Sequence, residues 1–311
     1  MVTRAAVIAR LAVAAAALAL LAPGALGAYG YLHDYDLYRG FPPPREAAGI
    51  AHGRLEQVSF YSPALRQRRS YLAYLPPGYD AGSARGVRYP VLYLLHAPVG
   101  RARNYAQAGG LEVRIDTLLA RRAIRPFLAV LPIGHGSAFG GDHEWADARA
   151  GRFESFVLDT VRATDSRYST LRNRRARMLA GLSAGAYGAV NISLHHPRMF
   201  GGFESWSGYF TQTPTYTFSG ASPALLRANS PAAYLPAIAP SIRRLPLRAF
   251  LYQGAADDVS ARAMLAFAGE LRAAGVRTRA AIYPGRHNWR LWRRHFSQML
   301  VFASRSLESA R

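Results

Sequence analysis

The chain of 311 residues contains no cysteine, and its basic residues are all arginine, with no lysine among them. The absence of cysteine excludes disulfides, cysteine nucleophiles, thiolate metal sites and a lipid anchor attached through a cysteine. Acidic residues are few, 18 against 39 basic ones, so the formal net charge is +21. The exclusive use of arginine indicates a coding bias, but a charge of this size would also attract anionic lipid headgroups or polyanionic envelope polymers. No nucleic-acid-reading motif accompanies it, so nucleic acid is not an expected partner.

The N-terminal residues have the pattern of an export signal. Two arginines precede an apolar run over residues 11–22, and small residues follow it. Such a charged start, apolar middle and small-residue end is typical of signal peptides. The uncharged stretch continues to Leu32 and is long enough to span a bilayer. We expect residues 1–28 to be a cleaved signal peptide or a retained membrane anchor, which places the remainder outside the cytoplasm.

The rest of the chain reads as a short linker followed by one large domain. Residues 29–51 contain Phe41-Pro42-Pro43-Pro44, which predicts an extended spacer. Residues 52–311 alternate strand-like and helix-like patterns without an internal repeat, and this alternation predicts an α/β fold with a mainly parallel sheet covered on both faces. The expected strands are Arg54–Tyr61 and Arg69–Leu75, which form an antiparallel start, then Val91–Leu95, Phe127–Pro132, Ala176–Ala180, Leu247–Gln253 and Thr278–Tyr283; the expected helices are Leu111–Arg122 and Ala261–Ala274.

A Gly-x-Ser-x-Gly motif is the strongest chemical signal in the sequence. Gly181-Leu182-Ser183-Ala184-Gly185 follows an apolar strand and opens a helix rich in small residues. A serine hydroxyl is a weak nucleophile unless a sharp turn presents it to a base and to substrate. The flanking glycines allow the strand and helix backbones to approach closely. This setting predicts that Ser183 is a catalytic nucleophile.

The residues that a serine nucleophile needs follow it in the order Asp, His. Asp257 comes just after the strand Leu247–Gln253, and His287 stands in a glycine-containing loop after the last strand. The carboxyl ends of parallel strands lie on one edge of the sheet, where ligands bind. We predict that His287 is the general base and that Asp257 orients it, with Asp258 as the rival carboxylate.

Several stretches together resemble the esterase D and antigen 85 type of α/β-hydrolases, which includes S-formylglutathione hydrolases, feruloyl esterases and mycolyltransferases. These stretches are Tyr71–Tyr79, Tyr89–His96, the Ser183 turn followed by His196-Pro197 and Phe200, and Ser205–Gly208. The resemblance covers roughly residues 54–304. It implies the α/β-hydrolase fold, and the nucleophile, acid and base of the family fall on Ser183, Asp257 and His287.

The oxyanion of the reaction needs hydrogen-bond donors as well. One is expected to be the backbone N–H of Ala184, directly after the nucleophile. The second is expected at Ala97, because Pro98 has no N–H. His96 is read either as a substrate contact or as a structural loop residue. Relatives carry His-Gly-x-Gly-Gly at this place, so His96–Gly100 departs from their pattern.

Two further regions are expected to shape the pocket. Residues 134–149 follow the fourth strand on the catalytic edge, and we predict that Trp145 is a pocket wall there and that Trp206 also contacts substrate. The acidic and histidine residues of this region show no recurring spacing, so no metal and no cofactor is predicted; they are Asp142, His143, Glu144 and Asp147. Residues 208–240 are too long for an ordinary connection and suit a lid or an acyl-chain cover.

These observations predict an exported serine esterase that acts on a small-molecule or lipid ester. Two alternatives remain open. The same acyl-enzyme can pass its acyl group to a sugar or lipid hydroxyl, as in the mycolyltransferases. A hydrolase-fold protein can also act only as a binding protein, although such proteins generally lose a catalytic residue and this sequence retains all three candidates. The oligomeric state is not predicted.

Overall fold

The computed structural model describes residues 26–98, 100–134 and 144–308. Most of the expected export segment, residues 1–25, lies outside this range, as do Asp142 and His143. Within the described ranges, no helix is long and apolar enough to cross a membrane.

Eight strands form the central sheet in the order β1-β2-β4-β3-β7-β8-β9-β10. Strand β2 is antiparallel to β1 and β4, and every other neighbouring pair is parallel. The prediction of a mainly parallel sheet with an antiparallel start is therefore confirmed. The strands are β1 (Arg54–Ser62), β2 (Gln67–Leu75), β3 (Val91–Leu95), β4 (Leu128–Pro132), β7 (Arg177–Leu182), β8 (Gly202–Trp206), β9 (Arg248–Gly254) and β10 (Arg277–Tyr283), and a separate small ribbon pairs β5 (Asp147–Ala148) with β6 (Gly151–Arg152).

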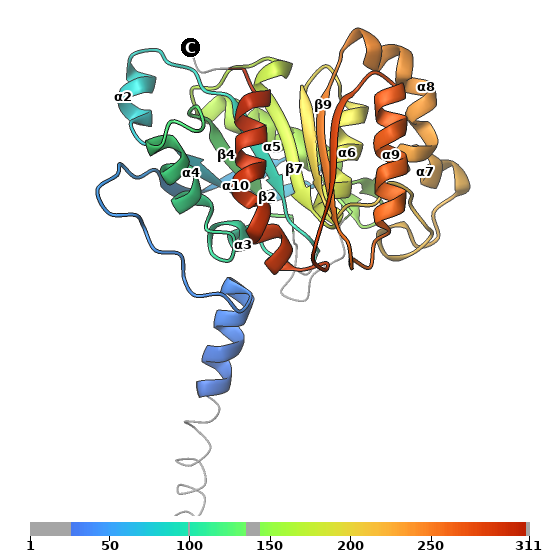
Figure 1. The fold of residues 1–311 in the computed structure, drawn as a ribbon. Helices are drawn as coiled ribbons and strands as arrows, with labels where there is room; N and C mark the ends of the chain where they lie inside the picture. The colour runs from blue at the N-terminus through green and yellow to red at the C-terminus, as the bar shows by residue number, and fades with distance from the viewer. Residues whose placement is uncertain (1–25, 99, 135–143, 309–311) are drawn as a thin grey trace, which may run out of the picture.

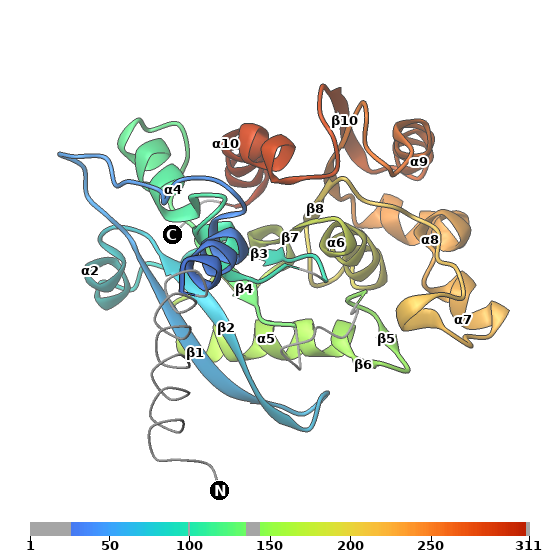
Figure 2. The same ribbon diagram turned by 90° about the horizontal axis from the view of Figure 1, so that it is seen from below.

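Helices cover both faces of this sheet (Figures 1 and 2). Strands β3, β4, β7 and β8 are buried along their whole length, as expected for parallel strands with a helical layer on each side. One layer packs α4 and α10 on the sheet, and the other packs α5, α6, α8 and α9. The helices are α2 (Tyr79–Ala84), α3 (Arg103–Ala106), α4 (Leu111–Ala120), α5 (Phe153–Arg167), α6 (Ala184–His195), α7 (Pro223–Ala228), α8 (Pro231–Arg244), α9 (Ala261–Ala273) and α10 (Trp289–Ser306).

The segment predicted to be a lid is instead part of the outer helical layer. Residues 208–240 contain α7 and most of α8, and Leu235 and Ala239 of α8 are buried against Leu251 of β9 and Phe267 of α9. The apolar side chains of α8 that we expected to cover the substrate therefore pack in the core.

The segment predicted to be an extended linker is helical over residues 26–38 and then turns back onto the domain (Figure 1). The Asn104 side chain donates hydrogen bonds to the carbonyls of Asp36 at 2.6 Å and Leu37 at 3.0 Å. Arg39 then adopts a left-handed conformation, with φ of 54°, which ends the helix. These contacts satisfy carbonyl groups that the helix end leaves unpaired and fix the segment beside α3.

A polar cluster connects α5 to the C-terminal end of α6. Glu154 accepts hydrogen bonds from His195 Nδ1 at 3.0 Å and from His196 Nε2 at 2.8 Å. Burial alone would raise the pKa of Glu154, but the hydrogen bonds from these histidines lower it to about 2. Burial likewise opposes protonation of His195, yet the hydrogen bond to Glu154 raises its pKa above the usual value. The cluster therefore connects the first turn of α5 to the end of α6.

This cluster predicts a pH-dependent contribution to stability. The lowered pKa of Glu154 stabilises the fold above about pH 4.5, and the raised pKa of His195 does so below about pH 6.5, with the histidine part lost as pH rises through its folded pKa. We expect Glu154→Gln to lower the free energy of unfolding by about 2 kcal/mol near pH 5.5 and by less at pH 9, measured by urea titration. Glu270→Gln, at an exposed site on α9, is the control. A difference that is constant with pH would contradict the linkage.

Candidate active site

Ser183 lies at a strained turn between β7 and α6. Its backbone has φ of 58° and ψ of −123°, a conformation that residues with a side chain rarely adopt. The turn is held because Ser183 N donates to the Trp206 carbonyl at 2.9 Å, while Ser183 O accepts from Ala186 N at 2.9 Å. Strain that the surrounding structure maintains at one residue is typical of a functional site.

The two glycines of the motif are required by close packing. A Cβ on Gly181 would lie 2.2 Å from the carbonyl oxygen of Gly185, and a Cβ on Gly185 would lie 1.9 Å from the carbonyl oxygen of Leu95. No side chain fits at either place. The start of α6 is thereby pressed against the end of β3, which brings the loop after β3 next to Ser183.

The loops that carry Asp257 and His287 are joined to each other. Ala255 N donates to the Tyr283 carbonyl at 2.8 Å, and Ala256 N donates to the Gly285 carbonyl at 2.9 Å. Asn288 caps α10 by accepting from the backbone of Arg290 at 3.0 Å, directly after His287. These bonds hold the ends of β9 and β10 in one arrangement.

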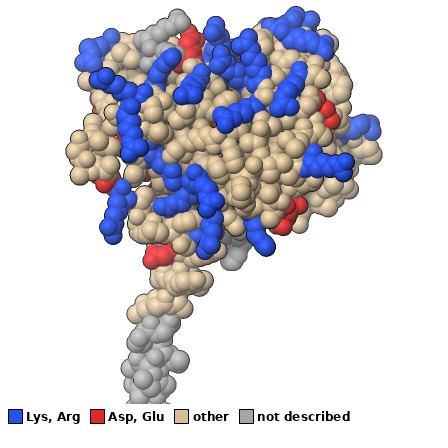
Figure 3. All heavy atoms as spheres, in the orientation of Figure 1, with Lys and Arg blue, Asp and Glu red and all other residues tan. Residues whose placement is uncertain are grey.

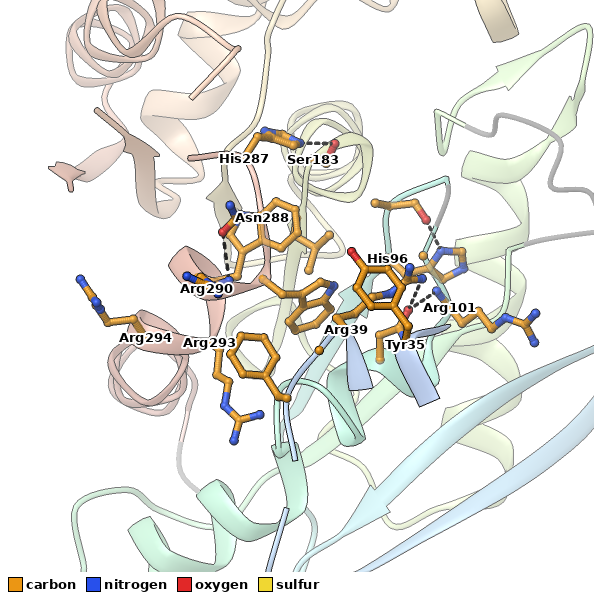
Figure 4. A pocket seen from close by; sticks show the side chains of 18 of the residues that line it. Tyr35, Arg39, His96, Arg101, Ser183, His287, Asn288, Arg290, Arg293 and Arg294 are labelled. Carbon is orange, nitrogen blue, oxygen red and sulfur yellow. Dashed lines mark hydrogen bonds between the residues drawn. The ribbon is translucent and has the colours of Figure 1, made fainter. Parts of the chain in front are cut away.

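Ser183, His287 and Asp257 form one hydrogen-bonded chain. His287 Nε2 lies 2.9 Å from Ser183 Oγ, and His287 Nδ1 lies 2.8 Å from Asp257 Oδ1. The dashed line in Figure 4 marks the first of these contacts. The side chain of Asp257 is fully buried, whereas Asp258 is exposed. The geometry thus selects Asp257 as the partner of the imidazole.

Asp257 lies in an environment that favours its carboxylate form. Burial would raise its pKa, but hydrogen bonds from His287, Ser207 and the backbone N–H of Val259 together lower it below the usual value. Its Oδ2 atom is buried and has no hydrogen-bond partner among the described residues. The Asp257 carboxyl group is therefore ionised throughout the range in which an imidazole titrates, which is a property required of a carboxylate that orients a histidine.

Ser207 and Trp292 support this acid and base, and the sequence pattern did not single them out for this. Trp292 Nε1 donates to Ser207 Oγ at 3.0 Å, and the Trp292 ring meets the His287 ring edge-on at 5.2 Å between centroids. Ser207 follows β8 with φ of 58°. Strand β8, which ends just before Ser207, lies in the sheet between β7, which leads to Ser183, and β9, which leads to Asp257. This position at the same edge of the sheet was the signal that could have identified Ser207.

The two predicted oxyanion donors flank the serine. Ala184 is the first residue of α6, where a backbone N–H has no acceptor within the helix. Ala97 lines the cavity that contains Ser183. Both N–H groups belong to segments held together by the contact of Gly185 with Leu95 and His96.

His96 is used structurally. Its Nδ1 lies 2.8 Å from the carbonyl of Ala97, and its Nε2 accepts from Gly134 N at 3.1 Å. Because the backbone occupies both ring nitrogens, His96 connects the loops after β3 and β4 while its edge lines the cavity. The hydrogen bonds give His96 a structural role, and because the residue also lines the cavity, a contact with substrate stays a prediction.

Neither predicted tryptophan lines the cavity, which corrects their assignment as substrate contacts. Trp145 is 1% exposed and donates a hydrogen bond from Nε1 to the His96 carbonyl at 2.9 Å. It packs directly against Gly188, where a Cβ atom would lie 2.5 Å from Trp145 Cβ. Trp206 is also 1% exposed and donates from Nε1 to Glu204 at 3.0 Å. Both stabilise the site from behind, within the core.

The acidic residues of the region after β4 serve other contacts. Glu144 accepts hydrogen bonds from Tyr209 and Gln212, and Asp147 accepts from the backbone and hydroxyl of Ser155. Across the described part of the chain, no group of three or more His, Asp or Glu side chains is arranged to hold a metal ion.

The cavity at Ser183 has a volume of about 1050 Å³. One wall comes from the loop after β3, one from the start of α10, and one from the N-terminal segment through Tyr35, Arg39, Gly40 and Phe41. That segment was expected to be only a spacer. The segment is more than 140 residues away from Ser183 in the sequence, and no motif in it indicated that it would line the cavity.

The chain matches the Esterase family model over residues 62–303. It belongs to the Esterase family. It is 32% identical over 163 residues to an endo-1,4-beta-xylanase/feruloyl esterase of Xylanibacter ruminicola, a match that covers 51% of this chain and 22% of that protein. Two further curated relatives are matched over 54% and 63% of their length. The membership confirms the resemblance and the prediction of a hydrolase.

Solved structures of esterases share the fold. A ferulic acid esterase superposes with a TM-score of 0.73 at 22% identity, covering 83% of this chain and 100% of that one. An S-formylglutathione hydrolase from Staphylococcus aureus superposes with a TM-score of 0.66 at 16% identity, covering 85% and 100%. At these identities the likeness establishes the α/β-hydrolase architecture.

Proposed function

We propose that this member of the Esterase family hydrolyses carboxylic esters through an acyl-enzyme on Ser183. The observation that carries the proposal is the continuous chain of hydrogen bonds in which His287 lies 2.9 Å from Ser183 and 2.8 Å from Asp257. An imidazole held between a hydroxyl and a buried carboxylate is the arrangement that activates serine.

The first half-reaction forms the acyl-enzyme. Ser183 Oγ attacks the ester carbonyl carbon while its proton moves to His287 Nε2. The resulting oxyanion is stabilised by the N–H groups of Ala184 and Ala97. The imidazolium then donates its proton to the leaving alcohol oxygen as the bond between that oxygen and the carbonyl carbon breaks. Asp257 holds the imidazole in the required tautomer and stabilises its charged form.

The second half-reaction releases the acid. A water molecule enters where the alcohol has left, His287 Nε2 takes one of its protons, and the hydroxide oxygen bonds to the acyl carbon. When the tetrahedral intermediate collapses, the bond to Ser183 Oγ breaks and His287 returns the proton to it. Glycerol or a sugar in place of water would give acyl transfer by the same steps.

We also propose that the enzyme acts outside the cytoplasm, close to an anionic membrane or envelope surface. The N-terminal sequence pattern supports export, and exposed apolar side chains continue along the helical segment, including Leu26, Tyr29 and Leu32. Arginines are abundant on the face seen in Figure 3, which favours an anionic surface.

A fluorophosphonate probe tests the mechanism, because it phosphonylates only an activated serine. We expect one adduct, mapped to Ser183 by peptide mass spectrometry, with labelling slowed by a competing short ester. Labelling of separated cytoplasmic, membrane and external fractions locates the active enzyme. An adduct on another serine, or none on the folded protein, would refute the assignment, and labelling confined to the cytoplasm would refute export.

A further inference from the structure

The cavity at Ser183 is lined by six arginines and, among the described residues, by no aspartate or glutamate. The labelled side chains stand on two sides of it in Figure 4: Arg290, Arg293 and Arg294 from the start of α10, and Tyr35, Arg39 and Arg101 from the N-terminal segment and the loop before α3. The sixth is Arg114 of α4. A concave site with one sign of charge concentrates ligands of the opposite sign.

The α10 side of the cavity has an unbalanced charge. Arg290, Arg293 and Arg294 have the spacing that puts side chains on one helix face, and the first turn of α10 contains no acidic residue. The N-terminal end of a helix carries a positive partial charge, so three arginines there repel both each other and the helix dipole. This electrostatic placement by itself does not stabilise the helix.

The partners of these arginines leave most of the charge uncompensated. Arg293 donates to the Ala108 carbonyl at 2.9 Å and lies 4.5 Å from the centre of the Phe41 ring. Arg114 donates to Gly109 O and to Ser297 Oγ. The guanidinium groups of Arg290 and Arg294 have no partner among the described residues. Burial, followed by the nearby charge of Arg293, lowers the pKa of Arg114.

The opposite side is partly neutralised. Asp36 lies 2.9 Å from Arg101 and 3.5 Å from Arg39, so one carboxylate serves two guanidinium groups. The cavity as a whole remains positive.

Arginine is abundant over the whole chain, and outside the cavity some arginines are paired with acids, as in Arg54 with Asp80 at 2.6 Å and Arg177 with Asp165 at 2.5 Å. What characterises the cavity is that six of these arginines are gathered around the nucleophile, with no acidic residue among the described residues that line it.

We propose that the ester cleaved at Ser183 carries an anionic group, a carboxylate or a phosphate, which binds along the α10 wall of the cavity. The inference rests on the proposed esterase function and names its substrate class. Planar guanidinium groups bind carboxylates and phosphates through paired, charge-assisted hydrogen bonds. Arg290 and Arg294 provide such groups without losing an existing partner.

The test compares two esters of equal acyl length, 4-nitrophenyl pentanoate and the mono-4-nitrophenyl ester of glutaric acid, which differ only in a terminal methyl or carboxylate. After correction for their spontaneous hydrolysis, we expect kcat/KM to be at least about tenfold higher for the glutarate ester at low salt. The preference should shrink as NaCl is raised. Benzoate and phenyl phosphate are then tested as competitive inhibitors of ester cleavage, with uncharged benzyl alcohol as the control. Their inhibition constants show whether a carboxylate or a phosphate binds better.

Substitution of the two unpaired arginines locates the effect. We expect the double variant Arg290→Gln/Arg294→Gln to lower the ratio of kcat/KM between the charged and neutral ester by about tenfold. Arg262→Gln removes one positive charge from an exposed site on α9, away from the cavity, and should leave the ratio unchanged. Thermal unfolding of each variant checks that the fold is retained.

The outcomes separate the two proposals. Equal turnover of both esters, or a ratio that the double variant leaves unchanged, overturns the anionic substrate class while the esterase remains. No cleavage of either ester and no fluorophosphonate adduct on Ser183 overturns both. A charged-ester preference that the arginine variants remove supports the inference.

Discussion

Ser183→Ala is expected to lower kcat for a 4-nitrophenyl ester by about 10⁵- to 10⁶-fold. The variant loses the proposed nucleophile, the hydroxyl oxygen Ser183 Oγ, which lies 2.9 Å from His287 Nε2. The remaining imidazole and oxyanion donors can at most assist a water molecule. Stopped-flow and steady-state release of 4-nitrophenol measure both the loss of turnover and the loss of any burst from acyl-enzyme formation.

Ser193→Ala is the matched control. Ser193 lies on the same helix, α6, and its buried hydroxyl has no hydrogen-bond partner among the described residues. We expect removal of this hydroxyl to leave kcat unchanged within about twofold, because the hydroxyl does not line the cavity and a Ser→Ala change alters the packing very little. Activity of Ser183→Ala at the level of the parent would show that another group performs the chemistry, whereas a parent protein with no activity above the spontaneous hydrolysis would indicate that it only binds.

Asp257→Asn is expected to lower kcat by about 10⁴-fold while leaving KM and the fold nearly unchanged. The carboxylate accepts the Nδ1–H of His287 at 2.8 Å and keeps Nε2 free to take the serine proton. An amide can present its NH2 group there instead, which favours the wrong tautomer and removes the negative charge that stabilises the imidazolium. The effect is measured as kcat across pH 5 to 9 together with the pH dependence of labelling by a fluorophosphonate.

Asp258→Asn makes the same chemical change at the adjacent residue. Asp258 is exposed, so we expect this variant to retain the kcat of the parent. A loss at Asp258 with little effect at Asp257 would reverse the assignment of the acid. The burial of Asp257 and its lowered pKa both argue against that result.

The strands and the order of the chemical groups were predictable because they depend on local patterns. A buried parallel strand is a short apolar run, and Leu247–Gln253 was expected where β9, Arg248–Gly254, is found. The turn at Ser183 was predictable because close backbone contact demands glycine on both sides. The choice between Asp257 and Asp258 rested on loop direction, which the structure resolves through burial.

The errors concern side chains whose roles depend on distant partners. Trp145 and Trp206 are residues of a type that often forms pocket walls, but both are buried in the core. Gly134 and Gly188 leave the space that the Trp145 ring fills, and Glu204 accepts a hydrogen bond from the Trp206 indole N–H. Residues 208–240 look like a cover only until α8 is seen to pack on β9 and α9. The hydrophobic effect favours an apolar side chain equally in the core and in the wall of a pocket. The sequence therefore does not distinguish a core position from a pocket position.

The sequence alone predicted the strands of the sheet other than β8, the turn at Ser183, and the order of the serine, aspartate and histidine along the chain, because each of these depends on a local residue pattern. The tertiary structure decided which groups touch and what surrounds them: the pairing of His287 with Asp257, the support from Ser207, and the arginine-lined cavity closed on one side by the N-terminal segment. Contacts between residues far apart in the chain depend on how the loops and helices pack, and no local pattern encodes that packing.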